Sequence, residues 1–218
     1  MVMNDLLLIV PSRSRQERII SFKEFFDKNS VNTDLCFGLD DDQYLTYPKF
    51  DNVIYDINPN MKLGPKLNTI SAKYCSDYKY IGFLGDDHLV KTKSWDQKLM
   101  NAISDIKYGI AYGNDLLQGQ ALPTALIMDS NIIKGLGYMC PPRQEHLYLD
   151  NFWLDLGNRL GTIRYCPDVI IEHMHHSTGK SRVDETYVST ADLNARDLAA
   201  YQLYLKNDFD NDIKRLSQ

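Results

Sequence analysis

The chain has 218 residues, 44% of them hydrophobic, and a formal net charge of −5. This length and composition fit a single globular domain over residues 1–218, and the scattered basic residues argue against a dedicated nucleic-acid binder. The apolar run at residues 6–10 is too short for a signal peptide or a membrane span, so we expect a cytoplasmic protein. Four widely spaced cysteines without a C-x-x-C pair argue against a zinc ribbon and favour buried free thiols.

The first half of the chain alternates apolar runs with helical patterns. The runs predict buried strands at residues 6–10, 34–39 and 52–56. Helical spacing of apolar residues predicts helices at 17–28 and between 63 and 76, the second opening at Gly64-Pro65. Strands that alternate with helices imply an α/β fold with a parallel sheet.

The next apolar run, residues 80–84, ends in Gly85, Asp86, Asp87 and His88. Open α/β sheets bind ligands beyond the carboxyl ends of their strands, which is where this acidic pair would lie. Adjacent carboxylates repel each other and are tolerated where solvent, helix-terminal N–H groups or a cation compensates their charge. A plain turn or N-cap role is the alternative interpretation.

The second half predicts further helices and strands. We expect helices at 95–106 and 148–160 and strands at 109–113, 125–128, 162–165 and 169–171. Glycines at 135 and 137 should break the chain, and residues 190–217 read as one long C-terminal helix. No internal repeat divides the chain.

Three histidines crowd the end of the last predicted strand. His173 and His175 would share one face of an extended segment, a spacing that suits a cation, and His173 directly follows the apolar run. A structural histidine is the alternative. We expect residues 178–189 to form a flexible loop in which Lys180 and Arg182 close over phosphates, or else a solvated surface loop.

Asp150 is embedded among aromatic and aliphatic neighbours at a predicted helix start. Burial would raise the pKa of this carboxyl toward the range of a general base, and the aromatic side chains offer a surface for a sugar ring. Helix capping is the alternative role.

The loop 11–15 and the acids 40–42 would lie at the ends of the first two strands, where doubly wound sheets bind nucleotides. Neither a G-x-G-x-x-G fingerprint nor a P-loop follows the first strand. Nucleotide binding would therefore use side chains and a cation.

Together these motifs resemble the GT-A glycosyltransferases, especially the small family 2-like enzymes of bacteria and phages, over about residues 5–185. The resemblance implies a GT-A fold with a mostly parallel central sheet flanked by helices. It also implies nucleotide-sugar-binding residues, namely Pro11, Ser12, Arg13, Arg15, Asp40, Asp41, Lys66, Asn68, Asp86, Lys180 and Arg182.

The same resemblance implies the catalytic roles. Gly85-Asp86-Asp87 matches the family's Asp-x-Asp motif, with Gly in place of the first acid, so Asp87 and His173 would bind Mn²⁺ or Mg²⁺. Asp150 would remove the proton of an acceptor hydroxyl that displaces the nucleoside diphosphate with inversion. Family acceptors are glycans, lipids, proteins or modified DNA bases.

Three other functions fit parts of the pattern. A nucleotidyltransferase also joins a doubly wound sheet to metal-bound carboxylates. A non-catalytic carbohydrate-binding module would use the many aromatic residues for stacking. A metal-dependent hydrolase would use the same Asp and His residues with water as the acceptor.

Overall fold

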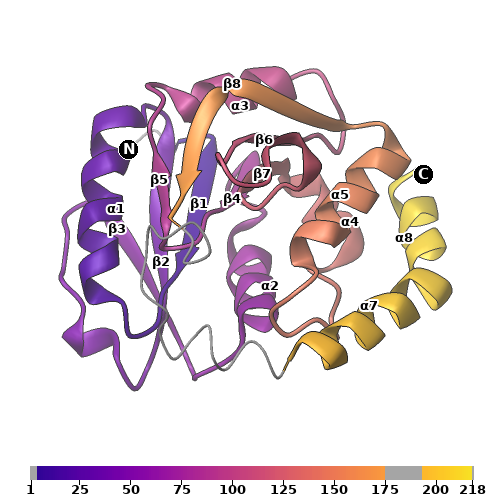
Figure 1. Cartoon of the computed structure of the whole chain (residues 1–218), viewed down its shortest axis with the longest axis horizontal. Helices are drawn as coiled ribbons and strands as arrows, with labels where there is room; N and C mark the ends of the chain where they lie inside the picture. Colours follow the sequence, from indigo (N-terminus) through magenta and orange to yellow (C-terminus); the bar gives the residue numbers. More distant parts are fainter. Residues whose placement is uncertain (1–3, 175–192, 218) are drawn as a thin grey trace.

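The computed structural model describes residues 4–174 and 193–217. Within these ranges, eight strands form one mixed sheet in the order β3-β2-β1-β4-β7-β6-β8-β5, flanked by helices on both faces (Figure 1). The expected α/β class is therefore confirmed. No helix in the described part of the chain is long and apolar enough to cross a membrane.

One half of the sheet is parallel, as expected. It consists of β3 (Val53–Asn58), β2 (Thr33–Asp40), β1 (Leu6–Pro11) and β4 (Tyr80–Phe83). The other half is mixed. There β7 (Leu126–Asp129) is antiparallel to β4 and to β6 (Ile110–Asn114), β8 (Ile163–His173) is parallel to β6, and β5 (His88–Val90) is antiparallel to β8.

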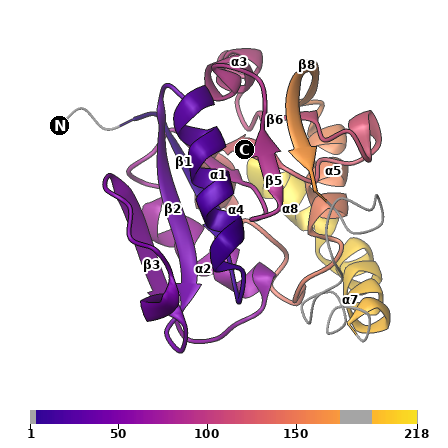
Figure 2. The same cartoon turned by 60° about the vertical axis from the view of Figure 1, so that its left-hand side comes forward.

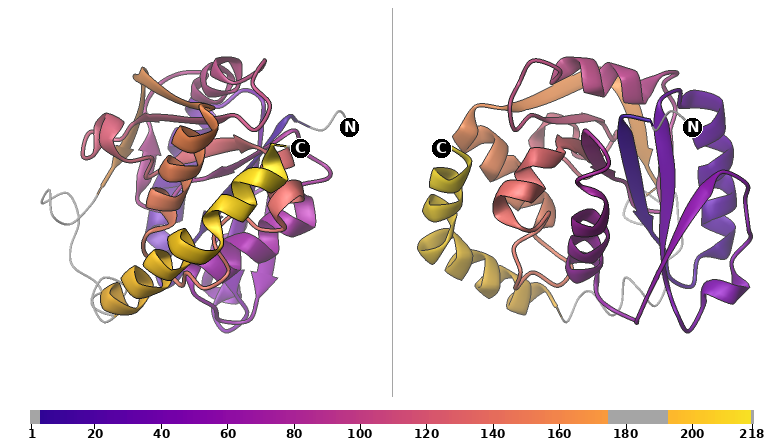
Figure 3. Two further views of the ribbon diagram at one scale, coloured as in Figure 1. Left: turned by 90° about the vertical axis from the view of Figure 1, so that its right-hand side faces the viewer. Right: turned by 180° about the vertical axis from the view of Figure 1, so that it is seen from behind.

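The helices pack over two apolar cores, one on each face of the sheet. One core contains α1 (Gln16–Asn29) and α3 (Trp95–Ala102). The other contains α2 (Leu63–Tyr74), α4 (Ser130–Leu136), α5 (Leu149–Leu160), α7 (Asn194–Asn207) and α8 (Phe209–Leu216). Seen from behind, α7 and α8 follow one another along the outside of this second layer (Figure 3).

Strand β1 shows why its sequence is apolar throughout. Leu6, Leu8 and Val10 enter the core with α1, whereas Leu7 and Ile9 enter the core with α2. All five side chains are fully buried. Because successive side chains of a strand point to opposite faces, a strand covered by helices on both faces must be apolar at every position. Each such burial stabilises the fold by roughly 1.5–3 kcal/mol.

Several expected boundaries were wrong. Residues 162–171 do not hold two strands: β8 is continuous, with its pairing to β6 shifted between Gly113 and Asn114. Pro167 lies in this irregular stretch, where its missing N–H does not break the sheet ladder. Helix α3 ends at Ala102 instead of residue 106, and the short strand β5 was not expected.

Gly135 does not break the chain but lies inside α4, a helix that was not expected. Asp129 caps its first turn by accepting a hydrogen bond from the Asn131 N–H, and Gly137 ends it with φ of 85°. A Cβ added at Gly135 would lie 2.6 Å from Cδ2 of Leu216, so the glycine admits α8 against α4.

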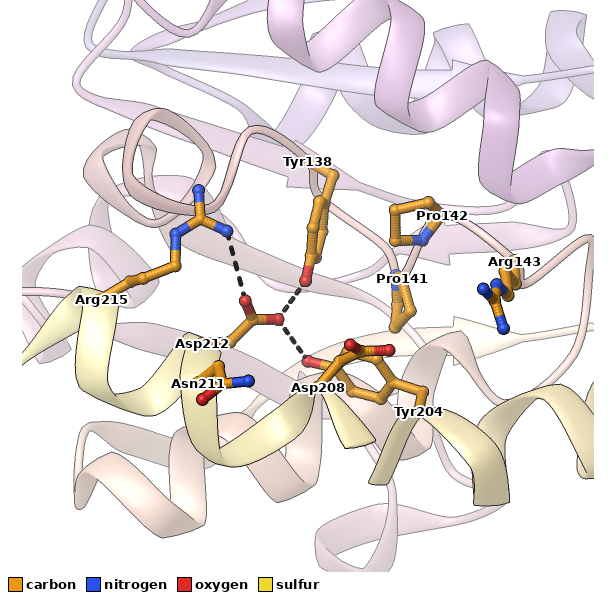
Figure 4. A pocket seen from close by; sticks show the side chains of 9 residues that line it. All are labelled: Tyr138, Pro141, Pro142, Arg143, Tyr204, Asp208, Asn211, Asp212 and Arg215. Atoms are coloured by element: carbon orange, nitrogen blue, oxygen red, sulfur yellow. Dashed lines mark hydrogen bonds and ion pairs between the residues drawn. The ribbon is translucent and has the colours of Figure 1, made fainter. Parts of the chain in front are cut away.

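The expected single C-terminal helix is two helices that meet at Asp208. The bend lets Asp212 of α8 accept hydrogen bonds from Tyr138 and from Tyr204, while Arg215 pairs with its other oxygen (Figure 4). These side chains border a surface cavity of about 350 Å³. The buried carboxylate is fully partnered there, so the cluster fastens α8 to the loop after α4.

Candidate functional site

A larger cavity, of about 710 Å³, lies where β1, β2 and β4 end. Residues from eight parts of the chain line it, around positions 11–15, 40, 60–66, 83–88, 124, 146–153, 173 and 193. Helix α1 begins at this edge and runs past β1 and β2, with β5 beside it (Figure 2). The expected edge of the sheet thus carries a cavity.

The β5–β8 pair brings two distant histidines together. His88 and His173 are direct partners in the antiparallel register, and their rings stack with centroids 4.1 Å apart. The end of β8 is held on both sides, because His173 N–H donates to the Asp115 carbonyl at 3.0 Å and Met174 N–H to the Asp87 carbonyl at 2.8 Å. Strand pairing therefore places both imidazoles beside Asp87.

The two carboxylate oxygens of Asp87 face different partners. Oδ1 lies 3.3 Å from Nδ1 of His88 and 3.6 Å from Nε2 of His173, whereas Oδ2 lies 3.4 Å from a guanidinium nitrogen of Arg18. Burial alone would raise the pKa of Asp87, but the hydrogen bond from His173 holds it well below its usual range. Asp87 is therefore an anionic oxygen donor beside two nitrogen donors.

Asp86 points to the other side of the turn. It accepts hydrogen bonds from Ser12 Oγ at 2.7 Å and from Arg15 at 2.9 Å. Burial raises the pKa of Asp86 to about 6, an effect that Arg15 opposes and the charge of Asp87 reinforces. Asp86 thus ties the loop after β1 to the loop after β4.

Asp40, at the end of β2, lies at the end of the cavity where the resemblance predicts nucleotide binding. Its oxygens pair with Lys66 Nζ at 2.5 Å and with Arg13 at 2.8 Å, and Arg13 also pairs with Asp42 at 3.0 Å. Tyr47 adds a hydroxyl 3.2 Å from Ser12 Oγ. Charged and hydroxyl groups therefore line this end of the cavity without a glycine-rich phosphate loop.

The opposite end carries Asp150, in the first turn of α5, together with Trp153 and His146. Burial raises the pKa of Asp150 and lowers that of His146. Asp197 of α7 fixes the preceding loop, because its carboxylate accepts hydrogen bonds from the backbone N–H groups of residues 145, 146 and 147. A carboxylate with a raised pKa thus faces the same cavity as Asp87.

Most residues expected at the site line this one cavity, namely Pro11, Ser12, Arg13, Arg15, Asp40, Lys66, Asp86, Asp87, Asp150 and His173. Asp41 and Asn68 are not among its lining residues. Asn68 instead accepts hydrogen bonds from Met139 and Cys140 N–H and donates to the Cys140 carbonyl, so it fixes a loop. Lys180, Arg182, His175 and the expected loop 178–189 lie outside the described residues.

Sequence reasoning left His88 open and missed other residues of the site, namely Arg18, Tyr47, Asp115, Thr124 and His146. Two signals could have found some of them. Arg18 lies in the first turn of α1, three residues after the N-cap residue Arg15, so the two side chains leave the chain close together. Asp115 comes directly after strand β6, just as Asp40 ends β2 and Asp86 comes shortly after β4. Thr124 and His146 lie in loops without a local pattern.

No protein-family model and no curated protein sequence matches this chain. Solved structures do resemble it. TarS residues 1–349 from S. aureus superpose with a TM-score of 0.57 at 13% identity, covering 78% of this chain and 60% of that one. The chain therefore spans less than two thirds of the length of TarS.

Two further structures were solved with ligands. The mannosyltransferase PcManGT from Pyrobaculum calidifontis, in complex with GDP-Man and Mn²⁺, has a TM-score of 0.56 at 10% identity and covers 100% of this chain and 74% of its own. Glucosyl-3-phosphoglycerate synthase from Mycobacterium tuberculosis was solved with Mn²⁺, UDP and glucosyl-3-phosphoglycerate. It has a TM-score of 0.57 at 11% identity, and the match covers 81% of this chain and 75% of the synthase. Identities this low show the fold alone. The chain has the GT-A fold of the nucleotide-diphospho-sugar transferases.

Proposed function

We propose that this protein is a cation-dependent inverting glycosyltransferase, which moves a sugar from a nucleoside-diphosphate sugar to an acceptor hydroxyl. The observation that carries the proposal is the convergence of Asp87, His88 and His173, whose donor atoms lie within 4.8 Å of one another. They border the same cavity as Asp150 and the basic side chains Arg15 and Lys66. Both ligand-bound neighbours contain Mn²⁺ together with a nucleotide or nucleotide sugar.

The three residues fit a divalent cation. Nδ1 of His88 is buried and has no hydrogen-bond partner among the described residues, although it lies 3.3 Å from Asp87 Oδ1. One carboxylate and two imidazoles are a donor set that suits Mn²⁺ better than Mg²⁺, which prefers oxygen ligands. When bound, the cation would neutralise the charge of the donor's diphosphate.

The donor would occupy the end of the cavity that Asp40 and Asp86 border. Arg13 and Lys66 already neutralise Asp40, and Arg15 neutralises Asp86, so these side chains are ordered before any ligand arrives. Pro11, Ser12, Arg13, Arg15, Asp40 and Lys66 would contact the nucleoside and its phosphates. A contact by Asp41, Lys180 or Arg182 stays a prediction of the resemblance, and Asn68 would act by fixing the loop at 139–140.

Asp150 would be the general base. In the described part of the chain it makes no ion pair, and its Oδ1 accepts only the N–H of Asn151, at 3.0 Å. Asp150 would take the proton of the acceptor hydroxyl while that oxygen bonds to the anomeric carbon. The bond to the diphosphate breaks on the opposite side and its electron pair leaves with the nucleoside diphosphate, so the sugar inverts. The acceptor would be a glycan, a protein or a modified DNA base.

The reaction class can be tested with the purified chain. UDP- and GDP-sugars are incubated with Mn²⁺, with and without a panel of glycan, peptide and hydroxymethylated DNA acceptors. We expect Mn²⁺-dependent release of nucleoside diphosphate, which Asp87→Ala abolishes. Asp210→Ala is the matched control, because this carboxylate is largely exposed and pairs only with Arg159 in the described structure. Pyrophosphate release from nucleoside triphosphates would instead identify a nucleotidyltransferase.

A further inference from the structure

A chain of hydrogen bonds behind His88 connects it to Asp115, which no motif singles out. Asp115 follows β6 and is buried, with 3% of its surface exposed. Its Oδ1 accepts the backbone N–H groups of Leu117, Gln118 and Gly119, at 2.7–2.9 Å. Its Oδ2 accepts the hydroxyl of Thr124 at 2.7 Å. A carboxyl that accepts four donors acts as an anionic acceptor.

Because Asp115 accepts the hydroxyl proton of Thr124, Thr124 determines which nitrogen of His88 carries the ring proton. A threonine hydroxyl has one proton, and that of Thr124 is directed to Asp115. Its oxygen lies 3.4 Å from Nε2 of His88 and can therefore only accept there. Nε2 of His88 must then carry the ring proton. The opposite tautomer would place two acceptors against each other.

The position of this proton determines how the other ring nitrogen of His88, Nδ1, meets Asp87. In the neutral ring with its proton on Nε2, Nδ1 of His88 holds a lone pair that faces Oδ1 of Asp87 at 3.3 Å. Two acceptors this close repel each other unless a positive charge lies between them. This agrees with the missing hydrogen bond at the buried Nδ1. Asp115 also lies behind the second imidazole, since its Oδ2 is 3.9 Å from Nδ1 of His173.

We propose that Thr124 and Asp115 are positioning residues that hold His88 in the Nε2–H tautomer, so that its Nδ1 binds the same divalent cation as Asp87 and His173. The inference rests on the proposed function, in which this cation assists the departure of the nucleoside diphosphate. Neither positioning residue touches the cation. Each acts through an imidazole that binds the cation. Residues that hydrogen-bond to metal-bound histidines act in the same way in other proteins.

The test uses Thr124→Val, which keeps the side-chain shape and removes the hydroxyl. We expect Mn²⁺ binding without nucleotide, measured by calorimetry, to weaken about 10- to 100-fold. Thr124→Ser restores the hydroxyl and should restore the affinity to within about threefold. Thr162→Val is the matched control, because the Thr162 hydroxyl is buried without a partner among the described residues and lies at the start of β8, away from His173.

A second measurement reports the tautomer of the His88 imidazole. Nitrogen NMR of the metal-free protein should show His88 with its proton on Nε2, and the Nδ1–H form should appear in Thr124→Val. A purely structural threonine would alter neither the tautomer nor the affinity once the variant is folded. An Nδ1–H tautomer in the wild type, or unchanged Mn²⁺ affinity in folded Thr124→Val, overturns the inference and leaves the proposed function standing. A wild type that binds no Mn²⁺ overturns both.

Discussion

Oδ1 of Asp87 lies 3.6 Å from Nε2 of His173, although the two residues come from the turn after β4 and from the end of β8. The β5–β8 pairing creates this contact, because it sets His88 directly opposite His173. A carboxylate and an imidazole at this separation leave room for a cation to bind both.

Replacing Asp87 should remove the cation without unfolding the protein. Asp87→Asn keeps the size of the side chain and removes the anionic oxygen between the imidazoles. We expect Mn²⁺ affinity to fall by more than about 100-fold, beyond the loss typical of an outer partner. Calorimetry gives the affinity, and Asp210→Asn should bind Mn²⁺ like the wild type. Unchanged affinity in Asp87→Asn would contradict the proposed cation site.

Asp150 should affect turnover and not donor binding. Asp150→Asn removes the proposed base, so we expect kcat to fall by about 10²- to 10⁴-fold. The thermal shift produced by UDP or GDP with Mn²⁺ should stay as in the wild type. A large loss of nucleotide binding with kcat retained would assign Asp150 to the donor site.

The raised pKa of Asp150 also predicts how activity and stability depend on pH. Because the base must be ionised, activity should fall as the pH drops through a pKa above the usual value of 3.8. A pKa raised by folding gives stability that is present below the unfolded pKa and lost as the pH rises. Asp150→Asn should therefore raise the Tm at pH 7 and not at pH 3. An equal Tm difference at both pH values would contradict this.

Asn68 should matter for stability and not for nucleotide contact. Asn68→Ala removes hydrogen bonds to Met139 and to both backbone groups of Cys140. We expect the free energy of unfolding to fall by about 1–3 kcal/mol, since buried backbone groups lose their partners. Denaturant melts measure this loss. A folded variant that loses nucleotide binding and keeps its stability would return Asn68 to the donor site.

Asp197 should act on catalysis from a distance. Asp197→Ala frees the backbone N–H groups of residues 145–147, which lead into Asp150. We expect a lower Tm and a kcat reduced by about 10-fold or more, because small displacements of a positioned group are costly. Mn²⁺ affinity should match that of the wild type. A variant with normal kcat would show that this loop does not position the base.

The sequence predicted the parallel half of the sheet because its strands are buried on both faces and so are apolar throughout. It also indicated Asp87 and His173, which follow short apolar runs, and Asp150, which lies at the start of a helix. It did not predict β5, three residues long and formed by pairing with β8. The predicted chain break at Gly135 was wrong for a related reason, because this glycine makes room for Leu216, which is distant in the sequence. Thr124 and Asp197 act through long-range hydrogen bonds, which leave no local pattern.

In the proposed mechanism, one cation is held between Asp87 and His173 within the donor cavity. Anomalous diffraction at the manganese edge, from crystals grown with Mn²⁺ and GDP or UDP, tests it most directly. We expect a manganese peak about 2.0–2.3 Å from Asp87 and His173, the range of metal–ligand bonds, and next to the diphosphate. A nucleotide bound in this cavity with no manganese between these two side chains would contradict it.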